Sequence, residues 1–120
     1  MRILFASKHD LDKEMEGSLI GILKPGSGEK VEIDQRMIIW HSSSDEAEDN
    51  DLNVEQWLDI ASQYDVICGA FPPSAYIALT IAREEAEESG NCIRVFTPIA
   101  AVGRGFANLR IYKFLRWQEI

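Results

Sequence analysis

The apolar positions of this chain fall into short blocks whose spacing predicts alternating strands and helices. Largely apolar runs, typical of strands buried on both faces, occupy Arg2–Ser7, Met37–Trp40, Asp65–Ala70 and Cys92–Thr97. Between them, apolar residues at helical spacing predict helices over 53–63 and 73–89. We therefore expect a single α/β domain over residues 1–120, with these four runs as the central parallel strands of a sandwich.

The last stretch of the chain predicts a strand of a different kind. Residues 98–109, centred on Gly103-Arg104-Gly105, are expected to form a loop, and no helix precedes the next strand, 110–117. Its alternation puts Ile111, Lys113, Leu115 and Trp117 on one face and Tyr112, Phe114 and Arg116 on the other. Without a crossover helix, we expect this strand to lie antiparallel at the sheet edge. Such an apolar edge strand needs a partner, which predicts a homodimer.

The first third of the chain leaves two interpretations open. Asp10 is a candidate cap for a short helix that carries Leu11 and Met15 and ends near Gly17. Residues 19–24 and 29–34 flank Pro25-Gly26-Ser27-Gly28, which favours a β-hairpin. The alternative is a helix that continues to Leu23.

Charge limits the possible partners. The net charge of −8 argues against broad binding to duplex nucleic acid. Residues 94–120 nevertheless carry a local charge of +4, and residues 1–93 carry −12. The basic segment suits an anionic ligand, or it pairs with the acidic helices. No apolar run is long enough to span a membrane, and the N-terminus enters a strand pattern directly. We expect a cytoplasmic protein without a signal peptide and without a membrane partner.

Metal ions and cofactors are not expected. The acidic stretch 45–53 lacks the central glycine and terminal glutamate of a calcium loop, so it predicts a mobile, solvated loop. Cys68 and Cys92 both lie in apolar runs, and neither has a His or Cys neighbour at the spacing of zinc ligands. We expect both to be reduced thiols in the core.

Candidate chemistry gathers at the ends of the predicted strands. Polar groups follow three of them, in Ser7-Lys8-His9, His41–Ser44 and Gly69–Tyr76, and Arg104 follows the strand that ends at Thr97. The carboxyl ends of parallel strands share one edge of a sheet, so these groups are expected to converge there. The helix that begins near Ser74 would direct free N–H groups to this edge, which favours a phosphate site. Phe71 and Tyr76 either cover the core or stack on a base.

Four stretches carry a resemblance to a known family: Met1–Leu11, Asp65–Phe71, the strand ending Phe96-Thr97 and Tyr112–Trp117. They are similar to small CRISPR-associated accessory proteins of the ring-nuclease group, which sense or degrade cyclic oligoadenylate. This resemblance implies a Rossmann-like three-layer fold and a cyclic oligonucleotide ligand, and it is compatible with a metal-independent phosphodiesterase. If the chain cleaves such a ligand, we expect His9 to act as general acid or base, with Lys8 and Arg104 stabilising the phosphorane. The predicted ligand-binding residues lie at the strand ends and the helix start and are Ser7, Gly69, Phe71, Ser74, Tyr76 and Thr97.

Two functional hypotheses follow. In the first, the chain binds and cleaves a cyclic oligoadenylate, and the symmetry of such a ring would favour a two-fold homodimer. In the second, it is a non-catalytic regulator that sequesters a nucleotide or binds a partner protein. Ligand turnover distinguishes the two.

Overall fold

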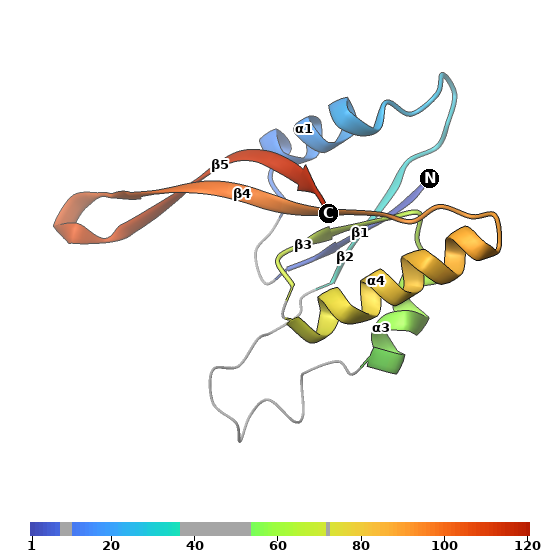
Figure 1. Cartoon of the computed structure of the whole chain (residues 1–120). Coiled ribbons are helices and arrows are strands. Elements are labelled where there is room, and N and C mark those ends of the chain that lie inside the picture. Colours follow the sequence, from blue (N-terminus) through green and yellow to red (C-terminus); the bar gives the residue numbers. More distant parts are fainter. Residues whose placement is uncertain (8–10, 37–53, 72) are drawn as a thin grey trace.

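In the computed structural model, residues 1–7, 11–36, 54–71 and 73–120 are described. Over these ranges the elements are β1 (Arg2–Ala6), α1 (Lys13–Leu23), β2 (Glu32–Arg36), α3 (Val54–Ala61), β3 (Val66–Gly69), α4 (Pro73–Glu88), β4 (Arg94–Arg104) and β5 (Arg110–Glu119), with a 3-10 turn at Phe106–Asn108 (Figure 1). The predicted α/β class is confirmed. The described residues contain no helix long and apolar enough to cross a membrane.

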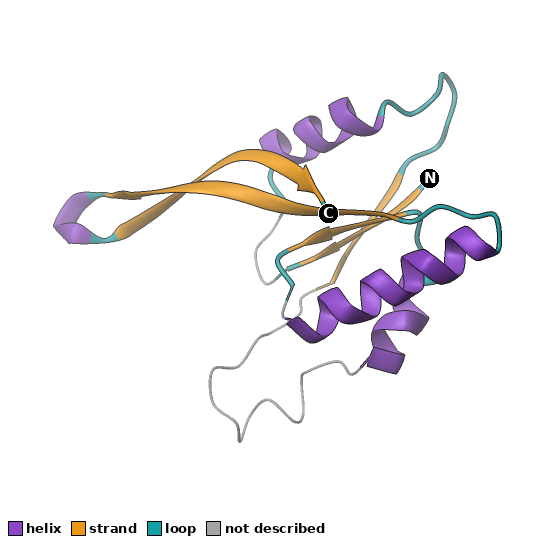
Figure 2. Cartoon of the chain, viewed as in Figure 1, coloured by secondary structure: helices purple, strands orange, loops and turns teal. Residues whose placement is uncertain are grey.

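The sheet has five strands in the order β2-β1-β3-β4-β5 (Figure 2). β1 lies parallel to both β2 and β3, with Ile3 opposite Ile33 on one side and Val66 on the other. β3 and β4 are also parallel, whereas β4 and β5 are antiparallel. The sheet is therefore mostly parallel with an antiparallel C-terminal edge strand, as the pattern predicted.

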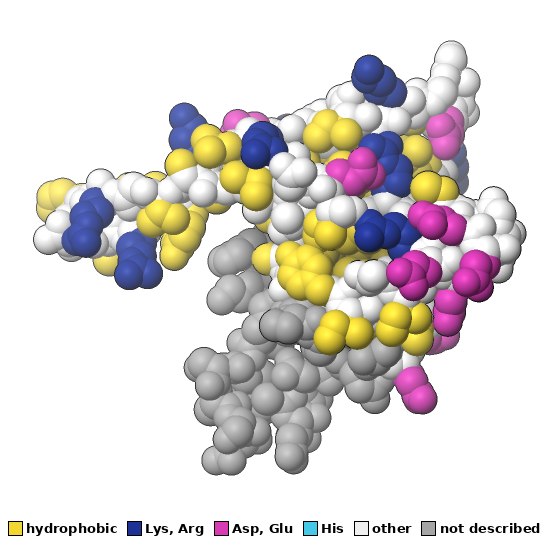
Figure 3. Space-filling model, in the orientation of Figure 1, with side chains coloured by type: hydrophobic (Ala, Val, Ile, Leu, Met, Phe, Trp, Pro, Cys, Tyr) yellow, Lys and Arg dark blue, Asp and Glu magenta, His cyan; other side chains and the backbone are white. Residues whose placement is uncertain are grey.

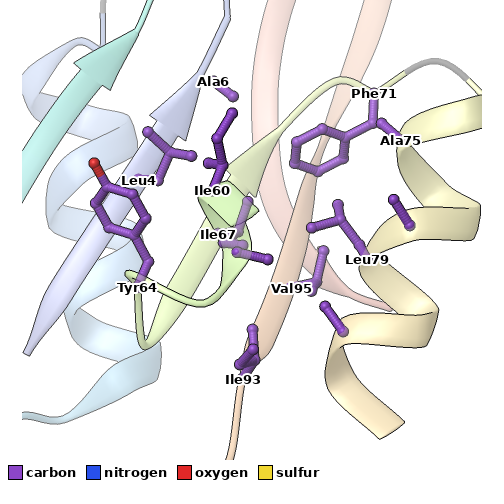
Figure 4. Packing of buried hydrophobic residues seen from close by; sticks show 13 residues of the cluster. Leu4, Ala6, Ile60, Tyr64, Ile67, Phe71, Ala75, Leu79, Ile93 and Val95 are labelled. Atoms are coloured by element: carbon purple, nitrogen blue, oxygen red, sulfur yellow. The ribbon is translucent and has the colours of Figure 1, made fainter. Parts of the chain in front are cut away.

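Helices cover both faces of this sheet, with α1 on one face and α3 and α4 on the other (Figure 1). Alternate residues of β1 point to opposite faces, which explains why the strand is apolar from Ile3 to Ala6. Leu4, Ile67, Leu79 and Val95 belong to one buried cluster on the face that α3 and α4 cover (Figure 4). On the α1 side, the buried cluster contains Ile3, Phe5, Leu19, Phe96 and Trp117.

The hairpin prediction for residues 19–34 is wrong, and the alternative of a continuing helix is correct. α1 runs through Gly17 to Leu23, because Leu19 and Leu23, one turn apart, are both buried. Its cap is Asp12, whose side chain accepts a hydrogen bond from the Met15 N–H at 2.8 Å. Asp10, the predicted cap, lies outside the described residues. The next strand is β2, parallel to β1; the run Met37–Trp40 also lies outside the description.

The loop prediction for residues 98–109 is wrong as well. β4 continues to Arg104 and pairs with β5 as far as the pair Arg104 and Arg110. β3 pairs with β4 only up to Phe96, so the rest of the hairpin projects beyond the parallel strands (Figure 1). We call residues 98–116 the β-arm. Its chain reversal is tight, with left-handed backbone at Ala107 and Asn108.

A β-bulge at the root of the β-arm changes which side chains share a face. Ile99 lies opposite Arg116, but Ala100 lies opposite Phe114, so Leu115 is the extra residue. Phe114 and Trp117, predicted on opposite faces, therefore share one, with ring centroids 5.5 Å apart. The prediction that side chains 110–117 alternate strictly between the two faces of the strand is therefore wrong.

The two cysteines differ in exposure. Cys68 is buried in β3, with its Sγ donating to the Leu4 carbonyl at 3.3 Å, as predicted. Cys92 precedes β4 and is exposed, so the prediction of a second core thiol is wrong. The acidic stretch 45–53 and His41–Ser44 lie outside the described residues.

Candidate functional site

A cavity of about 450 Å³ opens at the carboxyl ends of β1 and β3. We call it the carboxyl-edge pocket. In the strand order β2-β1-β3-β4, the chain reverses direction across the sheet between β1 and β3. Ligands of open α/β sheets bind in the crevice at such a reversal. The pocket therefore occupies the position where the strand order favours a binding site.

Four elements build the walls of this pocket. The end of β1 contributes Phe5 and Ser7, the start of α1 contributes Asp12 and Met15, the end of β3 contributes Gly69 and Ala70, and the β-arm contributes Pro98, Ala100, Tyr112 and Phe114. Because residues 98–109 were predicted as a loop and residues 110–117 only as an edge strand, the contribution of the arm was missed. The apolar alternation of residues 110–117 was the available signal, and it was assigned only to a sheet edge.

Gly69 is required by the backbone at the floor of the pocket. Its φ of 151° is a conformation that favours glycine, and a Cβ there would lie 2.1 Å from the Ala6 carbonyl oxygen. The glycine thus lets β1 and β3 approach each other where they end. It shapes the pocket through strand packing.

Of the predicted site residues, the structure brings Ser7 and Gly69 together on the pocket lining. Lys8 and His9 lie outside the described residues. Thr97 is half-buried in β4 opposite Gln118 and directly precedes the lining residue Pro98.

Phe71 and Tyr76 are not among the described residues that line the pocket. The Phe71 ring is buried in the core beneath α4 and meets the Tyr76 ring edge-on at 5.7 Å. The sequence left open whether these two rings cover the core or stack on a base. Their packing within the described residues is that of side chains that cover the core. Ser74 lies in the first turn of α4, and its side chain is outside the description.

Arg104 lies on the β-arm. β4 carries it four residues past the pocket wall at Ala100, and at 3.3 Å per residue its backbone is roughly 13 Å farther along the arm. The side chain is exposed. The arm thus separates Arg104 from Ser7 and Gly69, which the sequence had grouped with it.

The chemistry of the described lining is apolar and aromatic, with few charges. Asp12 is the charged residue among these lining residues, and none of them is basic. Cys68 lies directly before Gly69, but burial raises the pKa of its thiol to about 12. It is therefore protonated near neutral pH and is no nucleophile. No cluster of His, Cys, Asp and Glu within the described ranges could hold a metal ion.

Comparison of the sequence with protein-family models and with curated proteins finds no match.

Proposed function

We propose that this chain binds a nucleotide in the carboxyl-edge pocket, and that the nucleotide is a cyclic oligoadenylate. The observation that carries the proposal is the pocket itself, which opens where the strand order reverses and measures about 450 Å³. Small-molecule sites commonly have volumes of roughly 300–1,000 Å³. Tyr112 and Phe114 on the arm wall offer aromatic surface against which a base can pack. The sequence resemblance supplies the ligand class.

The proposal extends to the fold and its location. Helices on both faces of a sheet with the order β2-β1-β3-β4 support a Rossmann-like three-layer sandwich. We also propose that the protein acts in the cytoplasm, where a soluble nucleotide messenger would be available.

Cleavage of the ligand is the catalytic form of this proposal. The ligand's own 2′-hydroxyl would attack the adjacent phosphorus, and the 5′-oxygen would leave with a proton from a general acid. His9 is the candidate for the proton transfers, and Lys8 is the candidate for stabilising the charge of the phosphorane. Arg104 can share that role only if the arm carries it to a bound ligand.

Binding without turnover is the second candidate function. The position of Arg104 on the arm favours it, because one of the three proposed catalytic side chains is then remote from the pocket wall. In this form the chain sequesters the nucleotide or reports its presence.

Calorimetric titration with cyclic tetra-adenylate, followed by product analysis, tests both forms. Ala100→Trp fills the pocket and should weaken binding at least tenfold. Ala101→Trp makes the same change on the opposite face of β4 and should leave affinity within twofold. His9→Ala should slow turnover with little loss of affinity, since a general acid acts mainly in the transition state. Equal affinity in the two tryptophan variants, or no binding by the wild type, would overturn the proposal.

A further inference from the structure

The β-arm exposes an unusual combination of side chains. Its large apolar residues include Phe106 at the tip, 94% exposed, and Tyr112, 66% exposed. Val102, Leu109, Ile111 and Leu115 are also more than half exposed. The same nineteen-residue segment carries Arg104, Arg110, Lys113 and Arg116 and no acidic residue. Figure 3 shows these hydrophobic and basic side chains along the projecting arm.

This composition is typical of a protein interface. The centres of such interfaces are enriched in aromatic residues and arginine and depleted of Asp and Glu. Several of the exposed arm residues are aliphatic, and these gain more from packing against protein than from contact with nucleic acid. An apolar patch of this kind on a small soluble protein marks an interaction site.

The opposite end of the same chain carries the complementary charge. The second half of α4 exposes Glu84, Glu85, Glu87 and Glu88. Beside it, a groove of about 440 Å³ opens near the amino ends of β3 and β4. Asp65, Glu85 and Asn91 contribute to its lining, and no described lining residue is basic. We call α4 from Glu84 to Glu88, together with this groove, the acidic end.

One chain cannot join these two surfaces, because the arm projects from the carboxyl ends of the strands and the acidic end lies at their amino ends (Figure 1). The longest dimension of the structure is 51 Å. Two copies lying side by side in opposite directions would bring each arm to the other copy's acidic end. A two-fold axis between them makes the contact twice and closes the assembly.

We propose that the β-arm docks on the acidic end of a second copy of this chain, so that two copies form a dimer by exchanging arms. The arm contributes its exposed aromatic and aliphatic side chains and its arginines. The acidic end contributes carboxylates and the groove. This dimer does not depend on the identity of the nucleotide in the carboxyl-edge pocket.

A charge-swap experiment tests the contact by sedimentation velocity at 150 mM salt, without nucleotide. The arm variant is Arg104→Glu with Arg110→Glu, and the helix variant is Glu85→Arg with Glu88→Arg. Wild type should sediment as a dimer, and each variant alone should associate at least tenfold more weakly, because its two surfaces then repel. An equimolar mixture of the two variants should recover the dimer, since both contacts in the mixed pair are again complementary. Lys24→Glu with Lys30→Glu alters net charge as the arm variant does and should leave the dimer intact.

A second variant separates docking from folding. Phe106 is almost fully exposed, so Phe106→Ser should leave the melting temperature of the monomer unchanged and weaken association at least tenfold. A wild type that stays monomeric at 100 µM would overturn the proposal, as would an arm variant that dimerises normally or a mixture that stays monomeric. Binding of labelled single-stranded RNA by a monomeric wild type, lost in the arm variant, would instead assign the arm to nucleic acid.

Discussion

Cys68 and Cys92 lie in similar apolar stretches of sequence, yet only Cys92 is exposed. Burial raises the pKa of Cys68 from its ordinary value of 9.0 to about 12. Above pH 9 the unfolded chain loses a thiol proton that the folded chain keeps. The free energy of unfolding should therefore fall as the pH rises, by up to about 1.4 kcal/mol per unit between pH 9 and 12. Urea unfolding at several alkaline pH values measures this slope.

Cys68→Ala should flatten that slope, whatever its effect on stability at pH 7. Cys92→Ala is the control and should keep the slope. Burial and the nearby Asp34 carboxylate also raise the pKa of Tyr64, whose contribution appears above pH 10 in both variants. Identical slopes in the two cysteine variants would contradict the assignment to Cys68.

At the scale of elements, Trp117 anchors β5 to the body. Its indole N–H donates to the Met15 carbonyl of α1 at 2.9 Å, and its ring meets Phe5 edge-on at 6.3 Å. Trp117→Ala should lower the free energy of unfolding by about 3–5 kcal/mol, because it empties a buried aromatic site. Trp117→Phe keeps a ring but loses the hydrogen bond, and should cost less. Urea unfolding followed by circular dichroism measures both.

Leu115→Ala is the matched control on the same strand. Leu115 is 55% exposed, so its truncation should change the free energy of unfolding of the monomer, measured in the Arg104→Glu with Arg110→Glu background, by no more than about 0.5 kcal/mol. If Leu115→Ala were as damaging as Trp117→Ala, the root of the arm would not be anchored through Trp117.

Elements were predictable where local pattern and burial agree. The buried strands β1 and β3 were predicted because a strand covered on both faces is apolar throughout. The bounds of α4 follow from Pro73 at its start and Gly90, with a φ of 79°, just past its end. The hairpin error arose because the turn signal at Pro25–Gly28 is compatible with a helix end as well as with a hairpin. Burial of Leu19 and Leu23 in the core cluster on the α1 side of the sheet decides between them, and those contacts are not local in sequence.

Only the part of the pocket formed by the ends of β1 and β3 was predictable from the sequence. Ser7 and Gly69 follow strands whose parallel arrangement the sequence indicated, and the structure brings them together. Tyr112 and Phe114 were missed because their position depends on two features without a local signature. One is the pairing of residues 98–104 with β5, and the other is the bulge at Leu115. Nonlocal pairing thus determined the half of the pocket that pattern could not reveal.

At the scale of the whole molecule, the β-arm joins the two proposed sites. Its root forms one wall of the carboxyl-edge pocket through Ala100, Tyr112 and Phe114, and its tip carries the arginines proposed to dock on a second copy. A partner that holds the arm would fix the position of this wall. The arm would then lose less conformational freedom when a ligand binds. Occupancy of the pocket and dimerisation should therefore favour each other.

Saturating cyclic tetra-adenylate should therefore strengthen dimerisation, by a factor within the roughly 5–150-fold range usual for such coupling. Each dimer holds two pockets, so loss of the dimer in Arg104→Glu with Arg110→Glu should weaken nucleotide binding at each pocket by the square root of that factor, although neither side chain lines the pocket. Sedimentation with and without nucleotide gives the first factor, and calorimetry of the arm variant gives the second. Ala100→Trp should still dimerise but show no response to nucleotide, because its pocket is filled. Equal dimerisation constants with and without bound nucleotide would show that the arm's root and tip act independently.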